Sequence, residues 1–257
     1  MRRRIERLAL LGFLAGGAAF VLRGPLREAR WQIQAAAELL WLPASAPPAR
    51  APVPVRIAHA GGAWLGLRYT NALEALDHNY ARGARWFEMD FLSDASGEFW
   101  AVHSWGEKPK ATAPFRVPRM EDVLGWFGRH GDARLITDTK GDNRALLHKL
   151  TSAPPDVRAR IHPQIYRFGE YPLARSGAFA APIFTTYRSA YPWWALRRFV
   201  RGHPVLAVTV TREQARDACA ALRGTVPLLT HTVNDTAEAA HLLQAGIAGI
   251  YTDELLP

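Results

Sequence analysis

The sequence predicts an α/β fold, a (β/α)8 TIM barrel preceded by an N-terminal segment. Short apolar runs alternate with helix-period stretches over about 200 residues, which favours a parallel sheet with crossover helices. Polar side chains close nearly every apolar run, as in barrels whose active site lies at the carboxyl ends of the strands. A doubly wound open sheet is the alternative architecture, but it leaves fewer strand ends pointing at one centre.

Composition narrows the classes of function. The 257 residues suffice for one domain of roughly 200 residues with an appendage. The net charge is +9, but residues 1–50 alone hold eight arginines against three glutamates. The rest of the chain has no basic stripe and no nucleic-acid-binding motif, so we expect no nucleic-acid partner. The single cysteine, Cys219, excludes an intrachain disulfide and a cysteine-rich zinc site.

Residues 1–24 are predicted to be a signal-anchor or transmembrane segment. Four arginines precede an uncharged run from Leu8 to Leu22, so a basic region is followed by an apolar one. This run is shorter than the roughly 20 residues of a membrane span, and a cleaved signal peptide or a soluble helix are the alternatives. The early arginines favour a membrane-anchored protein whose C-terminal domain is periplasmic or extracytoplasmic.

Residues 25–54 are predicted to form an amphipathic helix and a Pro-rich linker. The helix is expected to lie beside a membrane or to form a neck or an oligomer contact, and the sequence leaves the oligomeric state open. Its apolar residues at helical spacing are Leu26, Ala29, Ile33, Ala36, Ala37 and Leu40. Five prolines between residues 43 and 54 stiffen the linker, and the barrel is expected over residues 55–257.

Within the barrel, nine apolar runs are strand candidates and the intervals between them show helical periodicity. The predicted strands are 55–59, 86–91, 99–103, 135–140, 161–166, 182–187, 204–210, 226–232 and 248–252. The clearest helical patterns are Thr70–Arg82, Arg119–Arg129, Trp193–Arg201, Arg212–Arg223 and Thr236–Ala245.

The ends of three early strands carry the most informative residues. Glu88 and Asp90 lie two apart in one strand, so both side chains point to the same face. His59 and His103 end the neighbouring runs. Two carboxylates with converging histidines suit a hard divalent cation and acid–base chemistry on a phosphate ester. The later strand ends carry Asp138, Lys140, Gln164, Arg188 and Asn234.

These motifs, in this order, resemble the glycerophosphodiester phosphodiesterases, members of the superfamily that includes the phosphatidylinositol-specific phospholipases C. The similarity covers the chain from about residue 55 to its end. The motifs that carry it are His59-Ala60-Gly61, Thr70-Asn71-Ala72, Glu88-Met89-Asp90, His103-Ser104, Asp138-Thr139-Lys140, Thr230-His231-Thr232-Val233-Asn234 and Gly246-Ile247-Ala248-Gly249-Ile250-Tyr251-Thr252-Asp253.

The resemblance implies a role for each group of residues. His59 and His103 correspond to the acid–base pair of the family. Glu88, Asp90 and Asp138 correspond to the residues that hold Mg²⁺ or Ca²⁺, the cations that oxygen ligands favour. Lys140 is expected to face the phosphate. The position of three further residues at strand ends, and not the resemblance, makes them candidate substrate contacts, with packing at the barrel rim as the alternative: Gln164, Arg188 and Asn234.

Several positions depart from the family pattern. Ala60 replaces the arginine beside the first histidine, which removes a bidentate phosphate donor that lysine cannot replace. Asp138 is one methylene shorter than the usual glutamate. A divergent branch acting on a small phosphodiester or a lipid head group fits this pattern. The alternatives are a lyase that releases a cyclic phosphate and a catalytically degenerate, membrane-tethered barrel that acts as a binding protein.

Overall fold

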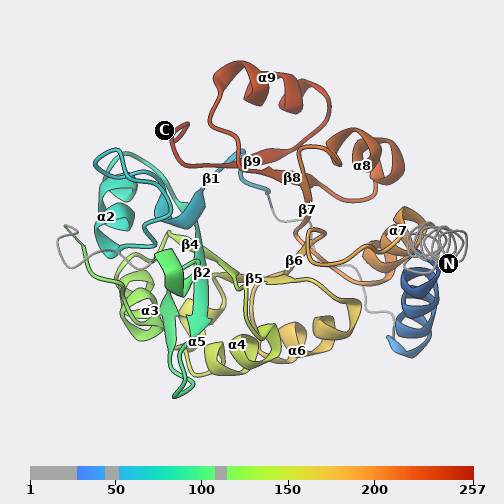
Figure 1. The fold of residues 1–257 in the computed structure, drawn as a ribbon, viewed down its shortest axis with the longest axis horizontal. Helices are drawn as coiled ribbons and strands as arrows, with labels where there is room; N and C mark the ends of the chain where they lie inside the picture. Colours follow the sequence, from blue (N-terminus) through green and yellow to red (C-terminus); the bar gives the residue numbers. More distant parts are fainter. Residues whose placement is uncertain (1–27, 44–51, 108–114) are drawn as a thin grey trace, which may run out of the picture.

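A closed parallel barrel forms the body of the molecule, in a computed structural model that describes residues 28–43, 52–107 and 115–257. Eight strands follow one another around the ring, and β1 pairs with both β9 and β2 to close it (Figure 1). They are β1 (Arg56–Ala58), β2 (Trp86–Ser93), β4 (Arg134–Asp138), β5 (Ile161–Ile165), β6 (Ile183–Thr185), β7 (Ala207–Thr211), β8 (Leu228–His231) and β9 (Gly249–Thr252). The predicted (β/α)8 barrel is therefore confirmed.

Helices surround this ring on its outer face (Figure 1). They are α2 (Leu73–Ala81), α3 (Met120–Arg129), α4 (Asn143–Leu150), α5 (Pro155–Arg158), α6 (Tyr171–Ser176), α7 (Trp193–Gly202), α8 (Ala215–Leu222) and α9 (Thr236–Gln244). Three single 3-10 turns follow strand ends, at His59–Gly61, Trp105–Glu107 and Phe168–Glu170. Side-chain caps begin two of the helices, since Asp142 accepts from the backbone of α4 and Asp235 from that of α9.

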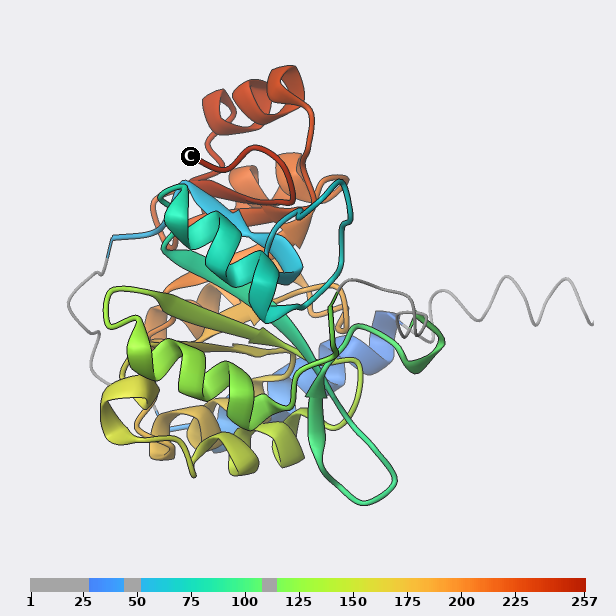
Figure 2. The same ribbon diagram turned by 90° about the vertical axis from the view of Figure 1, so that its left-hand side faces the viewer.

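One predicted strand does not belong to the barrel. The run 99–103 forms the short strand β3 (Phe99–Ala101), which pairs antiparallel with the far end of β2. β2 is eight residues long, so it extends beyond the ring and carries this hairpin on the rim (Figure 2). An apolar run of this length is equally compatible with either pairing, which is why the sequence pattern did not separate the two.

Alternation along β2 divides the core into two layers. Phe87, Met89 and Phe91 point outward into the large apolar core between the strands and the helices. A smaller cluster containing Ile57, Ile136 and Ile183 fills the inside of the barrel. The charged residues Glu88 and Asp90 lie on the inward face of the same strand and are buried.

The helix over residues 28–41 packs along the barrel next to α7. Trp194 at the start of α7 donates to the Gln32 side chain at 2.7 Å, and His203 just after α7 contacts the Pro43 carbonyl at 3.1 Å. Tyr191 donates to Glu38 in the middle of this contact, at 2.7 Å. The two helices therefore run side by side in the same direction.

The predicted apolar face of this helix is not the face that packs on the barrel. Ala35 is fully buried, whereas Ile33 is 70% exposed and Leu40 is 83% exposed. The stripe that the spacing predicts therefore faces outward, as the predicted membrane or oligomer contact requires, and Trp31 and the polar Glu38 supply the contacts with the barrel. Predicted residues 1–24 lie outside the described part of the chain. Within that part no helix has the length and apolarity of a membrane span.

Barrel closure predicts one sensitive glycine. A Cβ on Gly249 would lie 2.0 Å from the Pro54 carbonyl oxygen, a backbone atom that cannot move aside freely. We expect Gly249→Ala to lower the free energy of unfolding by about 1–3 kcal/mol, as overpacking does. Gly131→Ala is the matched control, because nothing lies within 4 Å of its added Cβ. Urea unfolding of both variants checks this, and equal stability of the two would contradict it.

A buried histidine predicts how stability responds to acid. His162 is 2% exposed and its Nδ1 donates to the Ala181 carbonyl at 2.9 Å. Burial lowers the pKa of His162 to about 4. The unfolded chain therefore takes up this proton near pH 6.5, before the folded protein does, so stability falls as the pH drops from about 6.5 to 4, by at most about 1.4 kcal/mol per pH unit. His162→Gln should reduce that slope in urea titrations at several pH values, and an unchanged slope would exclude this histidine as its source.

Candidate active site

A cavity of about 430 Å³ opens at the carboxyl ends of the strands. Most of the predicted site residues reach it, together with several aromatic side chains that the prediction did not include. Its lining consists of His59, Tyr69, Glu88, His103, Asp138, Lys140, Gln164, Tyr187, Arg188, Thr209, His231 and Tyr251. The volume is of the size that small ligands occupy in proteins.

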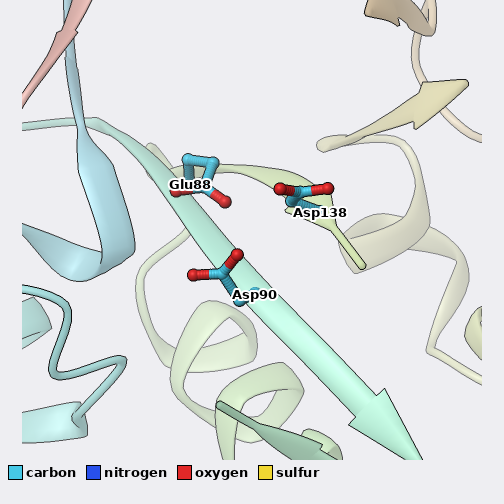
Figure 3. A group of neighbouring side chains, drawn as sticks. All are labelled: Glu88, Asp90 and Asp138. Carbon is cyan, nitrogen blue, oxygen red and sulfur yellow. The ribbon is translucent and has the colours of Figure 1, made fainter. Parts of the chain in front are cut away.

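Three carboxylates form a cluster at this cavity, and two of them, Glu88 and Asp138, line it. Glu88 and Asp90 come from β2 and Asp138 ends β4, where Asp90 and Asp138 are direct partners in the strand register. One oxygen of each lies within 4.8 Å of the others, and all three side chains are buried (Figure 3). The alternation rule that placed Glu88 and Asp90 on one face is thus confirmed, and the neighbouring strand brings the third acid to them.

Two loop residues hold the acids of β2 in place. The backbone N–H of Ala60 donates to Glu88 Oε2 at 2.9 Å. Asn71 makes two hydrogen bonds to Asp90, because its amide donates to Oδ2 at 3.1 Å and its oxygen accepts from the backbone N–H at 2.9 Å. Both Ala60 and Asn71 have left-handed backbone conformations, with φ of +47° and +49°. Such conformations are uncommon for residues other than glycine and recur at functional sites.

Asp138 is surrounded by donors. The Tyr187 hydroxyl donates to Asp138 Oδ2 at 2.5 Å, Lys140 donates to the same oxygen at 2.5 Å, and Tyr166 donates to Oδ1. Burial acts to raise the pKa of Asp138, but the Lys140 charge and these hydrogen bonds outweigh it and lower the pKa. Asp138 is therefore the acid of the three that most readily keeps its negative charge.

The other two acids resist ionisation. Burial, followed by the charge of Asp90, raises the pKa of Glu88 to about 8. Burial and the charge of Asp138 raise the pKa of Asp90 as well. The Lys140 ammonium is 3.7 Å from Asp90 and compensates only part of this repulsion. Three buried oxygen donors with unfavourable mutual charge fit a hard divalent cation, which would be held by Glu88, Asp90 and Asp138.

His59 is oriented by the last strand of the barrel. Its Nδ1 is 2.9 Å from Asp253 Oδ1, and its Nε2 is 4.0 Å from Glu88 Oε2. Because a carboxylate only accepts, Nδ1 carries the proton of that hydrogen bond and Nε2 is left facing the acids. Burial acts to lower the pKa of His59, but Asp253 and Glu88 outweigh it, so the pKa is raised.

His103 lies across Tyr69 from His59. The Tyr69 ring makes edge contacts with both imidazoles, with centroid distances of 4.5 Å to His59 and 5.5 Å to His103. Both histidines line the same cavity as Glu88 and Asp138. The strand ends therefore bring the two predicted imidazoles to one space, although His103 follows the antiparallel strand β3 and not a barrel strand.

The predicted substrate contacts fall into different environments. Gln164 lines the cavity and accepts a hydrogen bond from Thr185. Arg188 donates to the backbone carbonyls of Thr139 and Gly141 at 2.5 and 3.1 Å. These hydrogen bonds stabilise the loop that contains Lys140. Asn234 is not among the lining residues of the cavity. Its side chain forms hydrogen bonds with residues 252 and 253.

Comparisons with solved structures agree with the fold described above. No protein-family model matches the chain, and no curated protein matches it. Among solved structures, a glycerophosphodiester phosphodiesterase from Parabacteroides distasonis has a TM-score of 0.63 at 15% identity, over 77% of this chain and 92% of that one. One from Thermotoga maritima has a TM-score of 0.56 at 16% identity, over 78% and 94%. The chain has the glycerophosphodiester phosphodiesterase fold.

A third structure with this fold contains a ligand. A phosphodiesterase from Oleispira antarctica, in complex with the product sn-glycerol-3-phosphate, has a TM-score of 0.58 at 15% identity, over 78% of this chain and 93% of that one. These similarities confirm the fold that the sequence motifs implied.

Within this fold, sequence reasoning missed the residues that support the site. Asp253 and Asn71 stand in two of the quoted motifs, Thr252-Asp253 and Thr70-Asn71-Ala72, so the signal for them was present. Tyr166 ends the predicted strand 161–166, but only Tyr69 had no signal at all, because an aromatic residue near a strand end is equally common as packing. Their contacts become visible only when distant strand ends are brought together.

The acidic cluster predicts a stabilising response to cations. We expect saturating Mg²⁺ or Ca²⁺, at about 100 times its dissociation constant, to stabilise the protein by about 2.7 kcal/mol, or roughly 5–10 °C in melting temperature. Glu88→Gln should abolish most of this shift. Asp156→Asn, which alters an exposed carboxylate on α5, should retain it. Differential scanning calorimetry with and without EDTA checks this. Equal shifts of the melting temperature in both variants would show that the cation does not bind at these acids.

Proposed function

We propose that this chain is a metal-dependent phosphoric diester hydrolase that acts on glycerophosphodiesters or phospholipid-like phosphodiesters. One observation carries the proposal: at the carboxyl ends of the barrel strands, two histidines line the same cavity as Glu88 and Asp138, two members of a cluster of three buried carboxylates. The fold shared with phosphodiesterases supports it. A phosphodiester is anionic, so its hydrolysis needs charge neutralisation as well as proton transfer, and these two sets of residues provide for both.

The three acids and Lys140 prepare the site for an anion. When bound at Glu88, Asp90 and Asp138, a divalent cation, Mg²⁺ or Ca²⁺, supplies neutralisation of phosphate charge and lowers the pKa of an oxygen ligand. Lys140 extends from Asp138 into the same cavity and adds a positive charge on the chain itself. The aromatic side chains in the lining exclude water from the phosphate, which strengthens these electrostatic contacts.

The two histidines exchange protons with the reacting oxygens. Asp253 fixes His59 so that Nε2 is the atom available to the cavity, and Asn234 in turn donates to Asp253 at 2.7 Å. One of His59 and His103 accepts the proton of the attacking oxygen, and the other donates a proton to the leaving alcohol. Asn234 is then a positioning residue, although the sequence pattern suggested a substrate contact.

The substitution at position 60 changes how phosphate is recognised. Ala60 offers only its backbone N–H, which is already used by Glu88. Of the nearby arginines, Arg68 pairs with Glu254, and Arg188 lines the cavity but donates through both terminal nitrogens to backbone carbonyls. We therefore propose that phosphate recognition depends on Lys140 and the acid-bound cation, which favours a substrate other than the simplest glycerophosphodiesters.

We also propose that residues 1–24 anchor the protein to a membrane, with the barrel on the periplasmic or extracytoplasmic side. The basic cluster followed by the uncharged run Leu8–Leu22 supports this placement. Residues 25–54 then connect the anchor to the barrel at residue 55, and the helix over residues 28–41 within them is packed on α7.

Turnover by histidine variants tests the proposed chemistry. The purified full chain should hydrolyse a phosphodiester from a panel of glycerophosphodiesters, lysophospholipids and phosphatidylinositol in the presence of Mg²⁺ or Ca²⁺. His59→Ala and His103→Ala should each lower kcat about 10²–10⁴-fold, the usual contribution of general acid–base catalysis. His148→Ala, at an exposed position on α4, is the matched control and should retain full activity.

Phosphorus NMR of the products separates the hydrolase from its alternatives. A phosphomonoester as the final product supports the hydrolase, whereas a persistent cyclic phosphate indicates the lyase. If the protein binds the phosphodiester but no metal-loaded sample converts it, the chain is a binding protein and not an enzyme. Full activity of His59→Ala would contradict the acid–base assignment.

A further inference from the structure

Exposed apolar side chains collect on one side of the cavity mouth. Leu65 is 69% exposed, Leu67 40%, Tyr69 45% and Trp105 37%. They belong to the segments that follow β1 and β3, whereas Val55, another exposed apolar residue, lies before β1 at the opposite end of the barrel. An apolar rim next to a polar cavity is unusual for a surface that faces only water.

The most exposed of these residues occupies a strained turn. Trp64 and Leu67 bond each other's backbone at 3.0 and 2.9 Å, which closes a two-residue turn over Leu65 and Gly66. The φ angles of Leu65 and Gly66 are +50° and +72°, so both are left-handed. An asparagine would adopt this backbone conformation with less strain, and its polar side chain would be well hydrated at the tip of the turn. Leu65 therefore combines backbone strain with an exposed apolar side chain, and a surface that covers the side chain removes the second of these two costs.

The chain reaches the barrel from the same side. Trp31 packs against Tyr191, with ring centroids 5.1 Å apart, and Arg167 lies over Trp31 at 5.8 Å. Tyr191 and Arg167 follow β6 and β5, at the mouth end of the barrel, whereas Pro43 reaches the other end at His203. Figure 2 shows the helix over residues 28–41 (blue) beginning on the side of the loop after β1. The uncharged run Leu8–Leu22 thus precedes a helix that starts at the mouth.

We propose that the mouth of the barrel faces and contacts a lipid surface, and that the substrate is a phosphodiester in the head group of a lipid within that surface. The turn at residues 64–67 and Trp105 enter the interfacial layer, where tryptophan, tyrosine and aliphatic side chains are stabilised. The lipid phosphate then enters the cavity while its acyl chain stays in the lipid. The substrate class depends on the proposed phosphodiesterase function, but the orientation of the barrel does not.

A second exposed apolar face gives the competing orientation. Ile33, Leu40 and Trp41 lie on the outer side of the helix over residues 28–41, with Leu40 and Trp41 at the end away from the mouth. If this face contacted lipid instead, the mouth would open along the membrane and not toward it. Leu40 is therefore a matched control for Leu65, since both are exposed leucines on opposite parts of the barrel.

Fluorescence quenching measures the orientation without any assay of activity. The full chain in a Cys219→Ser background, carrying either Leu65→Cys or Leu40→Cys, is labelled with an environment-sensitive fluorophore and placed in vesicles of phosphatidylcholine and phosphatidylglycerol. Nitroxide-labelled lipids should quench the label at position 65 at least about twofold more than the label at position 40. Equal quenching, stronger quenching at position 40 or none at either position would overturn the proposal. The proposal would also be overturned if light scattering showed a dimer in the absence of lipid and the label at position 65 were shielded from solvent in that dimer.

A kinetic comparison tests the substrate class. Leu65→Asn suits the turn, so it retains the fold while it removes the apolar tip. It should lower kcat/KM about tenfold for a lysophospholipid in vesicles and leave unchanged kcat/KM for the water-soluble glycerophosphodiester with the same head group. Leu40→Asn should change neither. Equal losses on both substrates would overturn the inference, whereas a lack of any turnover by the unsubstituted chain would refute the proposed function and leave the quenching result valid.

Discussion

The arrangement of this site depends on the burial of three carboxylates at the ends of two adjacent parallel strands. Asp90 and Asp138 are register partners, so their backbones are fixed side by side and their charges cannot separate. Such a cluster is unstable in a protein interior unless donors and cations surround it. The surrounding groups supply hydrogen-bond donors to the carboxylates. They include the backbone N–H of Ala60, the Asn71 amide and the two tyrosine hydroxyls that donate to Asp138.

Closure of the barrel supplies the other half of the site. His59 follows β1 and Asp253 follows β9, so their hydrogen bond joins residues 194 positions apart in the sequence. It forms only when the last strand pairs with the first, because that pairing aligns Ala58 with Thr252. The orientation of the first histidine is therefore a property of the complete ring. Local distortion of the β1–β9 seam, where Gly249 lies close to the Pro54 carbonyl, is expected to disturb catalysis as well as stability.

Sequence patterns predicted the parts of the site that lie on single strands. Alternation alone put Glu88 and Asp90 on one face, and the strand-end rule brought Asp138 and His59 to them. Contacts that depend on the three-dimensional course of the chain were not accessible in this way. The direction of β3 is set by pairing with the overlong β2, and the buried stripe of the helix over residues 28–41 is set by Tyr191 and Trp194 on a distant segment. Periodicity carries no information on either partner.

If the mouth of the barrel faces a lipid surface as proposed, the alanine at position 60 and the apolar rim have the same effect on which substrates bind. A soluble phosphodiester arrives in any orientation, so a bidentate guanidinium is valuable because it fixes the phosphate geometry as well as its charge. A lipid phosphodiester arrives already oriented, since its acyl chain is confined to the surface that the turn at residues 64–67 contacts. On this proposal the entropy of orientation is lost before binding, and recognition depends on the charge of Lys140 and on a cation held by the three acids. On the proposed orientation, the alanine at position 60 and the apolar rim therefore act in the same direction, because both favour a lipid over a soluble substrate.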